Sequence, residues 1–283
     1  MLDQTHCGSV SSTISRAGRM IAGAALILAI AGCAGNESDD ELVLPTTSAE
    51  PGLSAQHGGR GPSAAGELVE ALVKLATEGA KETTYQPGGG GDSLPAGTKL
   101  VVKRSKPPSE RGRTWVVPRE VVCNGVSDDG QRSDLTFVVD KADGALRLVS
   151  TIEAADEVFT EFRPPLLVVP AQMTVGKAAA IIEPVELIVH PRGQPNKIKN
   201  QGKGTNTLTL IGRDAVSVKG VSVECLKLIA RLQVDMSPAK VLTVTESWFA
   251  VDGSGLIAER RTERVTIAGL LIRNKKQHWV IDR

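Results

Sequence analysis

The sequence predicts a mainly β protein, a curved antiparallel sheet or half-barrel with one N-terminal helix. From Lys99 onward, short runs alternate apolar and polar residues between clusters of Gly, Pro, Asn and Asp, which is typical of antiparallel sheets. Asp143-Gly144 lies between two such runs and indicates a hairpin. Along 216–234 the apolar residues change faces near Cys225. Either a bulge or twist curves the sheet there, or one half of the strand is buried on both faces.

The chain begins with a segment typical of a targeting signal. Arg16 and Arg19 precede the apolar run 20–31, which leads through small residues to Cys33. A helix of about 12 apolar residues would span only roughly 18 Å of the ~30 Å hydrocarbon layer. The order is similar to a bacterial lipoprotein signal peptide. We therefore expect cleavage after residue 32 and acylation of Cys33, palmitate included.

An acylated Cys33 makes a membrane of the bacterial envelope the first expected partner. Ala34 follows it, where some inner-membrane lipoproteins carry an aspartate, and this favours the outer membrane, with the protein facing the periplasm or exterior. The main alternative is a secreted protein cleaved elsewhere, for instance after Ala34.

Composition divides the rest of the chain into two parts. Residues 33–65 are rich in Gly, Ser, Ala and Pro and carry several acids, which predicts a lipidated disordered tether. Residues 66–283 are expected to form one mainly β domain. The whole chain has a net charge of +1 and only eight aromatic residues, which argues against a nucleic-acid partner.

The single helix is expected at the start of this domain, over 66–76. Leu68, Leu72 and Leu75 recur there at helical spacing, and Ser63 is available as a cap. We expect this helix to pack on the sheet as a lid. The strands are expected at 99–104, 115–123, 135–139, 146–148, 157–162, 185–190, 207–211, 216–234, 241–251, 256–267 and 278–281.

Two charged segments, 192–203 and 259–264, could each bind a partner or have only a structural role. Arg192, Lys197, Lys199 and Lys203 fall in one connection rich in Gly, Pro and Asn, either an anion-binding loop or a solvated hairpin loop. The segment 259–264 is polar on both faces of a predicted strand. Its inward charges are expected to protect an exposed sheet edge, or to dock a partner there.

Two cysteines, Cys123 and Cys225, remain in the folded domain. An exported protein can form a disulfide, and two buried core thiols are the alternative. Sequence leaves both open, because the distance between the thiols cannot be derived from it.

No motif for a catalytic, metal or cofactor site is present, so we expect no cofactor and no enzymatic activity. His190 and His278 lie far apart in the sequence, and zinc needs three or four protein ligands. Scattered carboxylates such as Glu153, Asp156 and Glu157 leave a hydrolase as the least favoured hypothesis. That hypothesis predicts a pocket with convergent carboxylates of displaced pKa.

The second half of the domain carries a family resemblance. Residues 223–228, Trp248-Phe249-Ala250 and 253–257 resemble the repeated pattern of TapB-like bacterial envelope domains of unknown function. Residues 85–87 with Gly97-Thr98, and 164–166 with Gly176-Lys177, resemble that family's other recurring stretches. The similarity covers residues 85–283. It implies a half-barrel similar to lipoprotein-carrier folds, without established catalytic residues.

Three function classes follow, in decreasing order of preference. The first is a non-catalytic envelope lipoprotein that binds an amphiphilic or peptide ligand. The second is a structural or assembly factor that docks an envelope protein or polymer through sheet edges. The third is the hydrolase.

Overall fold

In the computed structural model, twelve strands close into a β-barrel. The structure describes residues 66–282, apart from the side chains of 128–130. The barrel strands in chain order are β2 (Glu82–Pro87), β3 (Thr98–Lys103), β4 (Thr114–Cys123), β5 (Val126–Val139), β6 (Leu146–Glu153), β7 (Val158–Val169), β9 (Ile181–Pro191), β10 (Asn200–Val218), β11 (Val221–Met236), β12 (Ala239–Ala250), β13 (Leu256–Ile267) and β14 (Leu270–Ile281). All neighbouring strands pair antiparallel.

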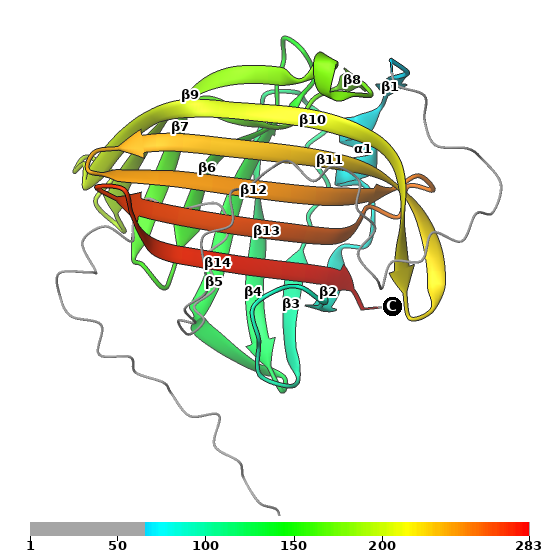
Figure 1. The fold of residues 1–283 in the computed structure, drawn as a ribbon, viewed down its shortest axis with the longest axis horizontal. Helices are drawn as coiled ribbons and strands as arrows, with labels where there is room; N and C mark the ends of the chain where they lie inside the picture. Colours follow the sequence, from blue (N-terminus) through cyan, green and yellow to red (C-terminus); the bar gives the residue numbers. More distant parts are fainter. Residues whose placement is uncertain (1–65, 283) are drawn as a thin grey trace, which may run out of the picture.

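The barrel is flattened into two layers whose strands cross (Figure 1). β10 to β14 form the front layer, and β2 to β7 form the layer behind it. β9 joins the layers on one side, and β14 pairs with β2 on the other. The prediction of a mainly β fold is confirmed, but the expected half-barrel is wrong because these two seams close the sheet.

Residues of one parity face the barrel interior along much of the sheet, although β6, β9 and β11 also have consecutive buried residues. Along β14, for example, Lys275, Gln277, Trp279 and Ile281 are buried, whereas the residues between them are more exposed. The registers carry this parity from strand to strand around the barrel. Leu100, Val121 and Leu187 belong to the apolar part of this interior.

A short helix, α1 (Leu72–Thr77), contributes to a second apolar cluster. Its Leu72 is fully buried in one cluster with the inward-facing Leu208 and Leu228. The helix is shorter than predicted, because Leu68 lies in the two-stranded pair of β1 (Leu68–Glu70) with β8 (Gln172–Thr174). A 3₁₀ turn, η3 (Lys177–Ala179), follows β8.

The expected strand 216–234 is two strands. The turn at Lys219-Gly220 separates β10 from β11. Cys225 and Leu226 are both buried, so the change of apolar face reflects burial on both sides of β11. The register irregularity lies on the neighbouring β10, between Leu210 and Gly212.

The Asp143-Gly144 hairpin is confirmed, since β5 and β6 pair across it. Asp143 accepts a hydrogen bond from the Ala145 N–H at 2.8 Å, and Gly144 has φ 73°. No helix among residues 66–282 is long and apolar enough to span a membrane. The signal peptide, Cys33, the tether and Ser63 lie outside the described residues.

Candidate functional site

A set of charged and polar side chains fills part of the barrel interior. We call it the interior charge cluster. It consists of Arg119, Glu153, Glu259, Arg261, Glu263, Arg273, Lys275 and Gln277, from β4, β6, β13 and β14. The segment 259–264 supplies three of its members, and strict alternation along β13 turns all three inward.

This arrangement corrects the hypothesis about 259–264. Its charges do point inward, but β13 is paired with β12 on one side and β14 on the other. The segment therefore protects no sheet edge, and it offers none to a partner. In a closed barrel an inward charge faces other interior side chains instead of solvent.

Ion pairs connect part of the cluster. Arg119 Nη2 lies 3.2 Å from Glu259 Oε1, and Arg261 Nη2 lies 2.9 Å from Glu263 Oε2. Arg273 Nε is 3.1 Å from the other Glu263 oxygen. Glu263 therefore bridges two guanidinium groups, one of them almost completely buried.

Several buried polar atoms of the cluster have no hydrogen-bond partner among the described residues. The donors are Arg119 Nε, Arg261 Nε and Nη1, Lys275 Nζ and Gln277 Nε2, and the acceptors include Glu153 Oε1. Leaving such an atom unsatisfied costs about 1–3 kcal/mol, more for a charged group. Native proteins normally satisfy these atoms with protein, water or a bound molecule. The excess of donors is the chemistry that an anionic group would complement.

Burial changes the protonation of two members of the cluster. Burial raises the pKa of Glu153 to about 8, because nearby cations offset only part of the desolvation. Burial, together with the charge of Arg273, lowers the pKa of Lys275 to about 7. Glu153 is therefore mostly neutral at pH 7, which leaves the cations of the cluster less compensated.

The three carboxylates singled out in the sequence take different positions. Glu153 is inside the cluster and 1% exposed. Asp156, in the β6–β7 turn, is within electrostatic reach of Arg273 and Lys199, and burial raises its pKa. Glu157 is exposed, with φ 50°. The sequence could not single out Lys275 or Arg119, because only the closed register brings them to Glu153.

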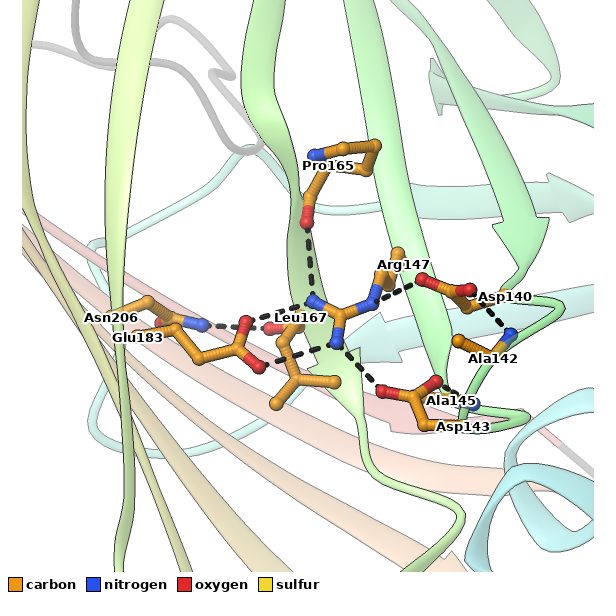
Figure 2. Close-up of polar contacts among 9 residues, drawn as sticks. All are labelled: Asp140, Ala142, Asp143, Ala145, Arg147, Pro165, Leu167, Glu183 and Asn206. Carbon is orange, nitrogen blue, oxygen red and sulfur yellow. Dashed lines mark hydrogen bonds and ion pairs between the residues drawn. The ribbon is translucent and has the colours of Figure 1, made fainter.

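In a second charged group, the guanidinium of Arg147 lies between three carboxylates of the protein (Figure 2). Arg147 Nη1 lies 2.8 Å from Glu183 on β9, and Nη2 lies 2.8 Å from Asp143. Its Nε lies 3.1 Å from Asp140. The backbone N–H of Ala145 and the Arg147 guanidinium hold the pKa of Asp143 below its usual range, against the opposing effect of burial. Every side of this guanidinium faces a protein acceptor, unlike the guanidinium of Arg261.

The predicted anion-binding connection is divided between a loop and a strand. Arg192, Lys197 and Lys199 are exposed on the loop between β9 and β10. Lys203 lies on β10, so its assignment to the loop is wrong. The flanking Gly202 and Gly204 allow the strand to continue, because a Cβ at Gly204 would overlap the Gln233 carbonyl oxygen.

An open depression of about 290 Å³ lies beside Lys203. Lys203, Glu186 and Asp235 contribute charges to its lining. Gly202 and Met236, both buried and inward-facing, also line it. The depression therefore combines charged groups with part of the barrel interior.

The histidines and cysteines form no shared site among the described residues. His190 Nδ1 lies 3.1 Å from the Lys197 carbonyl oxygen, and His278 contacts Gly89. No group of three or more metal-ligating side chains occurs in 66–282. No disulfide joins Cys123 on β4 to Cys225 on β11 in this part of the chain. The Cys225 thiol instead donates to Val223, at 3.5 Å.

No protein-family model matches the chain, the TapB-like domain included. No curated protein matches it in sequence. Among solved structures, the hypothetical lipoprotein YmcC from Escherichia coli K12 is similar at a TM-score of 0.30 and 8% identity. The alignment covers 74% of this chain and 88% of that one. This likeness is too weak to transfer a fold or a function.

Proposed function

We propose that the protein is a lipid-anchored protein of the bacterial envelope that binds an amphiphilic or peptide ligand without catalysing a reaction. The ligand presents an anionic group to the interior charge cluster. The observation that carries this proposal is the set of buried donors without a partner, above all Lys275 Nζ and Arg261 Nη1. A carboxylate, phosphate or sulfate would accept hydrogen bonds from them and offset their charge.

An amphiphile fits the surroundings of the cluster better than a purely polar solute does. The barrel interior continues from the charged groups into apolar side chains such as Leu187 and Met236. The depression at Lys203 places charged groups next to Met236. An anionic head and an apolar tail would each find matching chemistry within one barrel.

The anchor is the second part of the proposal. Acylation of Cys33 would hold the barrel at the membrane, with the outer membrane favoured, and residues 33–65 would act as the tether. Cys33→Ser is expected to abolish incorporation of labelled palmitate and release the protein from the membrane fraction. Retention of both label and membrane association would contradict the anchor.

Native mass spectrometry of the full chain, extracted from the envelope in mild detergent, tests the binding function. We expect a bound anionic amphiphile or peptide at one per chain. Lys275→Met should reduce its occupancy at least tenfold, whereas Lys74→Met, at an exposed position of α1, should not change it. An empty protein, or equal occupancy in both variants, would contradict the proposal.

Hydrolysis remains a second candidate for one specific reason. Glu153 interacts electrostatically with Asp156, both carboxyls interact with Lys275, and the pKa of each carboxyl is raised, mainly by burial. A hydrolase would turn over chromogenic esters or glycosides, and Glu153→Gln would reduce the rate at least 100-fold. Absence of turnover by the wild-type chain across such a panel would exclude these substrate classes.

A further inference from the structure

The strand ends at one edge of the front layer, on the left in Figure 1, carry several exposed large apolar side chains. At the start of β14, Leu270, Leu271 and Ile272 are 70%, 43% and 59% exposed. Ile198, on the β9–β10 loop, is 54% exposed between two lysines. Such side chains do not contribute to the folded core, so their exposure needs another explanation.

Basic side chains lie along the same edge. The strand registers place Lys203, Asp235, Lys240, Thr266 and Leu271 in one row across five neighbouring strands. At about 4.8 Å per strand, this row is about 19 Å long. Lys203 and Lys240 are exposed in this row with Leu271, and the exposed Asp235 lies between the two lysines.

The β9–β10 loop extends this charge beyond the row. Arg192, Lys197 and Lys199 are exposed, and the Lys199 N–H donates to the Val189 carbonyl at 2.7 Å, which fixes the end of the loop against β9. The loop thus alternates lysine, Ile198 and lysine next to the barrel wall. We call these exposed residues of the loop, the row and the start of β14 the basic-apolar edge.

We propose that the basic-apolar edge docks the barrel onto an anionic lipid surface, with Ile198, Leu270 and Leu271 inserted at the headgroup level. Insertion of apolar side chains and attraction of nearby lysines to anionic lipid are the two contributions that hold interfacial proteins on membranes. Each basic residue near such a surface contributes to binding, and the effect weakens with salt.

An anchor at Cys33 would be compatible with this orientation. The first described residue, Gly66, leads into β1, which lies at the opposite end of the front layer (Figure 1). The 32 residues between Cys33 and Gly66 make 33 Cα–Cα steps, which can extend to at most about 120 Å. This reach allows the far edge to meet the same bilayer, and docking would then orient a barrel that the anchor alone leaves free to turn.

Hydrogen–deuterium exchange of the full lipidated chain tests the docking. The protein is reconstituted into vesicles of phosphatidylcholine alone, or with 30% phosphatidylglycerol. Segments 192–199 and 268–272 should exchange at least threefold more slowly on the anionic vesicles. The turn 252–255, between β12 and β13, should not change. Salt at 0.5 M should remove the difference.

Two variants make the test specific. Replacement of Leu270, Leu271 and Ile272 by serine should abolish the slowing in both segments. Val221→Ser removes an exposed apolar residue from the β10–β11 turn and should leave the slowing intact. Equal exchange on both vesicle types, or slowing that survives the triple substitution, overturns the proposal. Ligand binding in the barrel is measured separately by mass, so failure of one proposal does not depend on the other.

Discussion

Glu153 and Lys275 show how burial can dominate the chemistry of single residues in this barrel. Both lie inside, and no protein group near them compensates fully for the loss of water. Burial disfavours the charged form of each group, which raises the pKa of the acid and lowers that of the base. Protonation of Glu153 and partial deprotonation of Lys275 therefore both reduce the number of charges buried inside the barrel.

The raised pKa of Glu153 predicts a pH-dependent stability. Its folded pKa is about 8 against a usual 4.5, so the stabilising difference is complete below pH 4.5 and is lost as the pH rises to 8. Glu153→Gln, which keeps a neutral side chain, should remove this loss. We expect the variant to gain roughly 3–4 kcal/mol over wild type between pH 5 and pH 8. Urea denaturation at both pH values measures it.

The matched control for this change is Glu70→Gln, at an exposed position of β1. It should leave the difference between pH 5 and pH 8 as in the wild type. If the free energy of unfolding changes between pH 5 and pH 8 by the same amount in Glu153→Gln and in the wild type, Glu153 is ionised in the folded protein. The interior would then contain more water than the burial indicates.

The charge of Arg147, unlike the charges of Glu153 and Lys275, is compensated by neighbouring protein groups. Its guanidinium faces three carboxylates and one carbonyl (Figure 2). Arg147→Met would leave Asp140, Asp143 and Glu183 repelling each other without a cation. We expect a loss of roughly 2 kcal/mol, less than for a fully buried pair because the carboxylates are partly exposed. Urea midpoints measure the effect, and Arg163→Met, which removes an exposed ion pair, should leave the midpoint unchanged.

At the scale of single elements, strand positions were the most predictable feature. The prediction of 256–267 agrees with β13, and 99–104 and 115–123 agree with β3 and β4 within one residue at each end. The alternating pattern carries this information because one face of each strand is buried. The N-terminal helix was predicted too long, because pairing of β1 with β8 overrides the helical spacing of Leu68 with Leu72.

The short helix α1 matters through one side chain. Leu72 is fully buried in the cluster that contains Leu208 and Leu228 from the barrel interior. Leu72→Ala should cost about 2–5 kcal/mol through lost burial and a residual cavity. Thermal unfolding with Leu68→Ala as control tests this, since Leu68 is 50% exposed. Equal effects of the two changes would show that α1 does not close the interior.

For the whole molecule, barrel closure was beyond the reach of the sequence. Closure depends on which strands meet at the two seams, and the alternating pattern of a strand is the same in an open and a closed sheet. The candidate site shows the same limit. The inward charges of 259–264 were visible in the sequence, but their partners Arg119 and Glu153 arrive from β4 and β6 only through closure.

The seam between β14 and β2 has the fewest paired residues of any neighbouring strands in this closed sheet. Three residue pairs join these strands, 279–281 with 85–87, whereas fifteen join β10 and β11. Regions with few backbone pairs open at lower free energy than the global transition. We therefore expect the amides of Gln86 and Val280 to exchange at least 100-fold faster than that of Leu208.

Native-state hydrogen exchange of the full chain, read by residue, measures this difference. An opening at β14 would expose Lys275 and Gln277 of the interior charge cluster, because both lie on the strand that leaves the seam. A ligand bound to the cluster should then slow exchange at Val280 more than at Leu208. Uniform protection around the barrel would mean that the seam does not open independently, and a ligand would have to enter from an end of the barrel.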